Sequence, residues 1–308
     1  MRPFLRLSLL LALALLAACH SREHAVTVGG DSPEAAVHES LALVRAGDFA
    51  GFWRHALPPR DYAMLREDWG RARAVEAPLD AAEQARIDAA LQQLAAPDAE
   101  TALDARLQPW LADAQARYGD QLPLLVGVGR ALASKAIEDD PRLGEEQKQH
   151  AIALVDALAP WAQQAPWFDP DKARQAVGVV VATARQLSLR DAQSLRAMDF
   201  DQAMHGYGTA FHALEQVLAL YGLPLDQALA SARVVPLEYH PPYARVRIEY
   251  QLLGRPLSME STLLQQNGRW YERDLIESVR RAHQRLAAPA GAATAPGSAM
   301  PGTVTALR

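Results

Sequence analysis

The hydrophobic pattern of this chain changes its period near Arg233, and this change constrains the fold more than any other feature. Before Arg233, apolar residues recur every three to four positions, which is typical of amphipathic helices. After it, in residues 244–252, apolar residues alternate without a break with charged or polar ones. Strict alternation indicates a strand with one buried face. The sequence therefore predicts an α+β fold in which a predominantly α-helical body precedes an antiparallel sheet.

Proline, glycine and aspartate residues divide the helical part into separate helices. The first is the clearest: Ser32 is a favoured N-cap residue, Pro33 suits the first helical position, and Gly47 is suited to end the helix. The expected helices occupy the segment from Ser32 to Gly47 and residues 48–57, 60–74, 80–95, 99–118, 121–138, 144–164, 170–187 and 200–221.

The C-terminal part is expected to form a four-stranded meander followed by a final helix. Asn267-Gly268 is a strong hairpin signal, because both residues tolerate a positive φ. Gly254-Arg255-Pro256 predicts the turn before it. Asp274 and Glu277 have the spacing of a capping box, which predicts the start of the last helix. The expected strands are 233–239, 244–252, 257–266 and 269–273.

The N-terminal segment has the layout of a secretory signal. Two arginines accompany an apolar run at 7–18, which is shorter than the roughly 20 residues that span a bilayer. The run ends at Leu16-Ala17-Ala18-Cys19, which resembles the lipobox of bacterial lipoproteins. The resemblance implies cleavage before Cys19, acylation of its sulfur by palmitate-like chains, and attachment to a membrane through them. The alternative is a secreted protein with a cysteine near its cleavage site.

The lipobox resemblance also implies a place in the cell. In bacterial lipoproteins an aspartate after the cysteine favours the inner membrane, whereas this chain has His20. The expected location is therefore the bacterial cell envelope, at the periplasmic face of the outer membrane. The chain then divides into a signal peptide (1–18), a lipidated N-terminus and tether (19–31), a helical body (32–231), a sheet with a final helix packing on the body (232–286) and a tail expected to be disordered (287–308).

Composition excludes some classes of function. The chain has 36 acidic and 31 basic residues and a formal net charge of −5. Nucleic-acid binding relies on Lys and Arg that neutralise phosphates, so no nucleic-acid partner is expected. Because Cys19 is the only cysteine, we expect no disulfide, and stability must come from a hydrophobic core.

Two segments also resemble the NTF2-like domains of envelope lipoproteins. In 32–70, Ser-Pro-Glu-Ala-Ala-Val and Arg-Ala-Gly-Asp-Phe resemble their first helices; in 232–277, Asn-Gly-Arg-Trp-Tyr resembles their late hairpin. The long helical stretch between the two segments departs from the family pattern. The resemblance implies a curved sheet that wraps helices around a pocket. The residues that would face this pocket are Val246, Ile248, Tyr250 and Trp270.

The helix at 200–221 carries the strongest candidate for site chemistry. Asp201, His205, His212 and Glu215 fall within an arc of about 80° and include metal-binding residue types. However, the two histidines lie about 10 Å apart along the axis. The apolar residues of this helix, among them Tyr207, Phe211 and Leu214, lie almost opposite. We therefore expect the polar stripe to be a solvated face and expect no metal site.

Other catalytic patterns are incomplete. Gly127-Val128-Gly129 resembles the start of a dinucleotide fingerprint, but Leu132 stands where a small residue is needed and no strand precedes it. These glycines instead predict a buried helix that a neighbour approaches closely. The chain lacks Gly-x-Ser-x-Gly and His-Glu-x-x-His motifs. No cofactor is expected, and the protein is not expected to be an enzyme.

Trp161, Trp167 and Phe168 form an apolar group at a predicted helix junction. Large aromatic residues usually fill a core, which is the favoured interpretation, and an exposed docking patch is the alternative. The leading functional hypothesis is a non-enzymatic, lipid-anchored envelope protein that acts as a scaffold or binds another envelope protein. The alternative is a carrier or sensor of a small apolar ligand in an NTF2-like pocket.

Overall fold

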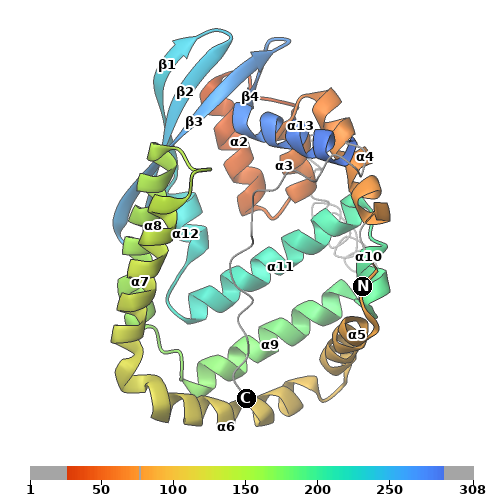
Figure 1. The fold of residues 1–308 in the computed structure, drawn as a ribbon, viewed down its shortest axis with the longest axis vertical. Helices are drawn as coiled ribbons and strands as arrows, with labels where there is room; N and C mark the ends of the chain where they lie inside the picture. The colour runs from red at the N-terminus through yellow and green to blue at the C-terminus, as the bar shows by residue number, and fades with distance from the viewer. Residues whose placement is uncertain (1–25, 76–77, 288–308) are drawn as a thin grey trace, which may run out of the picture.

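The computed structural model describes residues 26–75 and 78–287, and in this part the fold is α+β and predominantly helical, as expected (Figure 1). A helical body precedes an antiparallel sheet, and one helix follows it. The helices are α2 (Pro33–Arg45), α3 (Phe49–Ala56), α4 (Pro59–Val75), α5 (Ala81–Ala95), α6 (Ala99–Tyr118), α7 (Leu122–Asp139), α8 (Glu145–Gln164), α9 (Pro170–Leu187), α10 (Ala192–Arg196), α11 (Phe200–Leu220), α12 (Leu225–Ala230) and α13 (Arg273–Ala287), with a 3₁₀ turn η1 (Gly119–Gln121). The strands are β1 (Arg233–His240), β2 (Tyr243–Leu252), β3 (Arg255–Gln266) and β4 (Arg269–Glu272).

The helix boundaries lie close to those expected because side-chain caps define them. The Ser32 hydroxyl accepts a hydrogen bond from the Ala35 amide at 3.1 Å, and the Asp48 carboxylate accepts one from the Gly51 amide at 2.8 Å. Such caps satisfy amides that lack a partner within the helix. Helices α10 and α12 were not expected, because so few residues carry no readable period.

The sheet is a meander with strand order β1-β2-β3-β4. Asn267 and Gly268 both have positive φ, 51° and 75°, so the predicted hairpin turn is confirmed. The preceding turn lies earlier than expected, at Leu253 and Gly254, with φ of 52° and 75°. Strand β3 therefore begins at Arg255 rather than at 257.

The start of the last helix also differs from its prediction. Helix α13 begins at Arg273, so Asp274 lies in its first turn and does not cap it. Strand β4 runs directly into this helix, so the residue that precedes its first turn is the strand residue Glu272 and not Asp274.

One face of the sheet, the inner face, carries two hydrophobic clusters. At one end α2 packs against Val246, Leu263 and Trp270. At the other end α8 and α12 pack against Leu252 and Leu257. Both clusters use alternate residues of the same strands, as the period of two predicts. Helices α2 and α12 thus cover two separate parts of one surface.

Helix α13 is attached to α4 through two buried carboxylates. Arg280 donates to both oxygens of Asp61 at 2.7 and 2.9 Å, and His283 Nδ1 lies 2.9 Å from an oxygen of Asp68. Both aspartates are almost fully buried. A buried carboxylate is tolerated only when it is paired, so these contacts determine where α13 lies.

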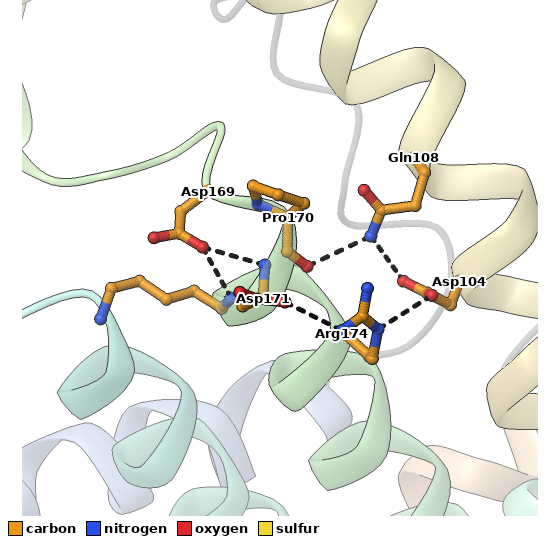
Figure 2. A network of polar contacts seen from close by, with 7 residues as sticks. Asp104, Gln108, Asp169, Pro170, Asp171 and Arg174 are labelled. Carbon is orange, nitrogen blue, oxygen red and sulfur yellow. Dashed lines mark hydrogen bonds and ion pairs between the residues drawn. The ribbon is translucent and has the colours of Figure 1, made fainter.

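A polar network connects α6 with α9 (Figure 2). Gln108 donates to Asp104 at 2.6 Å and to the Pro170 carbonyl at 3.1 Å, while Arg174 donates to Asp104 at 3.2 Å and to Asp171 at 2.8 Å. The hydrogen bond from Gln108, together with Arg174, lowers the pKa of Asp104. This network holds α6 along the edge of the molecule, where it leads into α7 (Figure 1).

Candidate functional site

The predicted lipidation residue, Cys19, lies outside the described residues, and so do the predicted signal peptide and all of the predicted tail except Ala287. The end of the predicted tether is described, and it belongs to the folded body. The amide of Gly30 donates to the Trp270 carbonyl at 3.0 Å, and the Trp270 amide donates to the Gly30 carbonyl at 2.9 Å. The folded body therefore begins before residue 32. This segment pairs with the edge of β4 through backbone atoms, and the side-chain pattern of the sequence gives no sign of such pairing.

The four residues predicted to face a pocket all lie on the inner face of the sheet. Val246 and Trp270 are buried against α2, so they belong to a packed core and not to a free surface. Ile248 and Tyr250 border a cavity. The alternation in β2 was sufficient to predict the face, but not which of its residues the helices cover.

This cavity, here termed the seam cavity, has a volume of about 340 Å³ and lies between α2, α8, α11, α12 and the sheet. Nearly all of its wall is hydrocarbon. It is lined by Leu41, Val44, Leu154, Phe211, Ile248 and Met259, together with the aliphatic side chains of α12 and the ring of Tyr250. A cavity of this kind suits a small apolar ligand.

The aromatic group at the α8–α9 junction is held in place by hydrogen bonds from its two indole nitrogens. Trp161 Nε1 donates to the Tyr221 carbonyl at 2.8 Å, and Trp167 Nε1 donates to the Ala162 carbonyl at 2.7 Å. The Trp167 ring stacks on Tyr221 with centroids 5.3 Å apart, while Phe168 beside it is half-buried. Bonded indoles packed on neighbouring rings favour the interpretation as core, and the docking patch at Trp161, Trp167 and Phe168 stays a prediction without support from this geometry.

Helix α7 presents a large apolar surface to solvent. Leu124, Val128 and Leu132 follow one another at intervals of four residues and are 69%, 50% and 67% exposed, with Leu125 beside them. These four residues are here termed the outer stripe. The opposite face of α7 packs on α8. In Figure 1 this pair of helices forms one edge of the molecule.

The prediction that α7 is a buried helix is wrong. None of its residues is buried, and a Cβ atom added at Gly127 or Gly129 would meet nothing within 4 Å. The sequence signal for the outer stripe was present: apolar residues surround this helix, and such a helix needs cover on every side. What the sequence does not say is whether this chain supplies that cover.

The polar residues of α11 do not form one site. Asp201 pairs with Arg66 of α4 at 2.7 and 2.6 Å, whereas His212 pairs with Glu215 at 2.9 Å. His205 and His212 both border a depression that faces α9, but neither Asp201 nor Glu215 lines it. Among the described residues, no group of three His, Cys, Asp or Glu side chains is placed to hold a metal ion.

The expected solvated face of α11 is wrong at Glu215, whose side chain is only 12% exposed. His212 Nε2 also lies 3.1 Å from the Ala46 carbonyl, so the turn between α2 and α3 covers this side of the helix. The hydrogen bond to Glu215 raises the pKa of His212, and the Ala46 carbonyl adds to this effect. In contrast, Tyr207 and Leu214 of the expected core face are half-exposed.

Glu272 lies on the inner face of the sheet, and its carboxyl provides a test of whether this face is buried. Burial raises the pKa of this carboxyl, although Ser261 donates a hydrogen bond to it at 2.7 Å. A carboxyl whose pKa is higher in the folded protein stabilises the fold at low pH and loses that contribution as the pH rises through the folded pKa. We expect Glu272→Gln to raise the melting temperature at pH 8 and to have little effect at pH 4. Thermal unfolding followed by circular dichroism measures both.

The matched control is Glu249→Gln, at an exposed position of β2. It should leave the melting temperature nearly unchanged at both pH values. An equal gain at pH 4 and pH 8 for Glu272→Gln would contradict the assignment of the effect to a buried charge.

We find no match between this chain and any protein-family model, curated protein or solved structure. Within residues 26–75 and 78–287, no helix is both long and apolar enough to cross a membrane.

Proposed function

We propose that this chain is a non-enzymatic, lipid-anchored envelope protein that binds another envelope protein through the outer stripe of α7. One observation carries the binding part of the proposal: four large apolar side chains lie in solvent on one face of a helix whose other face is packed. Contiguous exposed apolar patches on water-soluble domains mark interaction surfaces. The stripe follows the spacing with which a helix enters an apolar groove.

Charge favours a protein over a lipid surface as the partner. Acidic residues bound the outer stripe, with Asp120 before α7 and Glu138 at its end. The two basic residues of α7, Arg130 and Lys135, are paired with Asp156 and Asp139. Helices that lie on membranes instead carry Lys and Arg, which attract anionic headgroups. The open space beside Gly127 also lets a partner backbone approach α7 closely. The expected partner therefore presents an apolar groove with a basic rim.

The anchoring part of the proposal is supported by Leu16-Ala17-Ala18-Cys19, the lipobox-like motif. Two or more acyl chains hold a protein durably at a membrane, whereas one chain holds it only marginally. We expect metabolic labelling with a palmitate analogue to label the wild-type protein and not Cys19→Ser. Equal labelling of the two proteins would contradict the anchor.

Site-specific cross-linking tests the partner surface. A photo-reactive amino acid at position 128, in the outer stripe, should cross-link one discrete envelope protein in native membranes. The control is position 180, because Val180 of α9 is 45% exposed, close to the 50% of Val128. The combined variant Leu124→Glu, Leu132→Glu should abolish the product and leave the melting temperature within a few degrees, because both residues already face solvent.

The outcome identifies the class of partner. Adducts with lipid alone would overturn the proposal in favour of a membrane surface, and a product of twice the chain mass would overturn it in favour of self-association. Identical patterns from positions 128 and 180 would show that the stripe is not a specific surface.

A further inference from the structure

We infer that the seam cavity is a second binding site, separate from the outer stripe, and that it takes the aliphatic chain of a fatty acid or lipid. The inference goes beyond partner binding, since the cavity lies on the inner face of the sheet and α7 contributes nothing to its wall. It rests on the wall chemistry, on the way the wall is held open, and on the position of its polar groups.

The wall chemistry excludes a polar guest. Twelve residues line the cavity, and the Tyr250 hydroxyl is the only side-chain polar group among them. A guest with a buried hydrogen-bonding group would lose its bonds to water and find no replacement. A hydrocarbon loses nothing on entry and gains dispersion contacts with the leucine, valine and isoleucine side chains. The cavity volume, about 340 Å³, is at the lower end of the range for small-ligand sites.

The Tyr250 hydroxyl is already bonded away from the cavity. His150 Nδ1 lies 2.9 Å from the Ser258 carbonyl, so it carries the hydrogen and donates it there. This leaves the lone pair of His150 Nε2 to accept from the Tyr250 hydroxyl, 3.4 Å away. The tyrosine ring therefore presents carbon to the cavity and its oxygen to α8. The buried part of a ligand needs no polar group at all.

The cavity is held open by the packing on both sides of it. Ile248 belongs to the cluster that fixes α2, and Leu252 and Ala228 belong to the cluster that fixes α8 and α12. Closing the seam would require one of these buried clusters to separate from the sheet. Protein interiors seldom leave such a volume unfilled, and apolar cavities accept apolar guests rather than water.

The mouth of the cavity sets where the polar head of the ligand remains. Met259 lines the cavity and is 41% exposed, so the wall reaches solvent at β3. A single chain can enter beside this flexible side chain while its head stays in water. Free fatty acids and phospholipids share this chemistry, and the mass of the bound species distinguishes them.

Binding of cis-parinaric acid, a fluorescent fatty acid whose chain carries no polar group, to the full chain tests the inference. We expect saturable binding by the wild type. Two variants should weaken the affinity by about tenfold or more, in line with the effect of small volume changes in apolar pockets. Ala228→Phe fills the cavity from α12, and Met259→Trp obstructs its mouth. The control is Val180→Trp, at an outside position of similar exposure, 45%. It should bind the probe as the wild type does.

Native mass spectrometry of the protein extracted from its membrane should show one adduct with the mass of a fatty acid or a phospholipid. Cys19→Ser should retain this adduct, which separates a bound chain from covalent acylation, and Ala228→Phe should lose it. Circular dichroism should show native helix content in every variant. If Ala228→Phe does not fold, Met259→Trp decides, because Met259 is 41% exposed and belongs to neither buried cluster of the inner face. Absence of probe binding by the wild type, or equal binding by folded wild type and Met259→Trp, would overturn the inference.

Discussion

Replacement of His55 by alanine is expected to lower the free energy of unfolding by about 3 kcal/mol or more, because it removes a buried side chain that hydrogen-bonds to the backbone and leaves a cavity. His55 is only 2% exposed. Its Nδ1 lies 2.6 Å from the Thr27 carbonyl, and its Nε2 lies 2.9 Å from the Ala36 carbonyl. One side chain of α3 thus connects the N-terminal segment to α2. Urea unfolding followed by circular dichroism measures the loss.

The consequence of losing His55 should be greatest at the N-terminal segment. The Gly29 amide donates to the His55 carbonyl, and the Gly30 amide pairs with Trp270. In the variant we expect amide hydrogen exchange at Gly29 and Gly30 to become faster, since the neighbouring Thr27 contact is gone. In the sequence this segment follows Cys19. His55 therefore holds the chain that leads from the proposed lipid anchor against the folded body.

Two further variants separate the loss of the His55 contacts from the loss of side-chain volume and from the removal of a histidine elsewhere. His55→Gln keeps a donor and most of the volume, so it should lose less stability than His55→Ala. His38→Ala, at an exposed position of α2, should change the free energy of unfolding by no more than about 0.5 kcal/mol. Equal losses at positions 38 and 55 would contradict a buried bridge.

Gly208→Ala should have the second largest effect, a loss of about 1–3 kcal/mol of unfolding free energy, which is typical of overpacking. A Cβ atom at Gly208 would lie 2.1 Å from the Gly47 carbonyl oxygen, and backbone cannot move aside as the end of a side chain can. Gly47 has a φ of 67°, which favours glycine, so this turn has no easy alternative. The α2–α3 turn would have to separate from α11. Thermal and urea unfolding measure the loss.

The control lies two residues away on the same helix. At Gly206 an added Cβ atom would meet nothing closer than Leu187 Cδ2 at 3.8 Å, an ordinary contact. Gly206→Ala should therefore stabilise α11 by up to about 1 kcal/mol through helix propensity alone. A gain in unfolding free energy at position 206 together with a loss at position 208 would identify the backbone contact as the cause. A gain at both positions would contradict it.

Two histidines that contact the α2–α3 region, one in α3 and one in α11, show why residue type alone does not predict a role. His55 and His212 each contact a backbone carbonyl of this region, Ala36 and Ala46, yet only His212 was singled out by its neighbours in sequence. The stripe that drew attention to His212 suggested a metal site, whereas its structural partner is the Glu215 carboxylate. His55 had no such signal, because both its partners are backbone atoms of other segments.

The core face of α11 illustrates the same limit. The apolar period correctly predicted a helix at 200–221, but Phe200, Ala203, Met204 and Gly208 are the residues that are buried. Two of these, Ala203 and Gly208, are small residues, which carry little weight in a hydrophobic pattern although they permit the closest approach. Tyr207 and Leu214, which dominated the pattern, are half-exposed instead.

By itself, the sequence determined the longer helices, the order of the strands and the inner face of the sheet, because caps, turn residues and hydrophobic period act locally. It also predicted that Val246, Ile248, Tyr250 and Trp270 share a face. Only the tertiary structure decided that α2 and α12 leave a cavity at Ile248 and that the outer stripe of α7 has no cover. Both depend on which helix packs on which, and that is set by contacts between residues far apart in the chain.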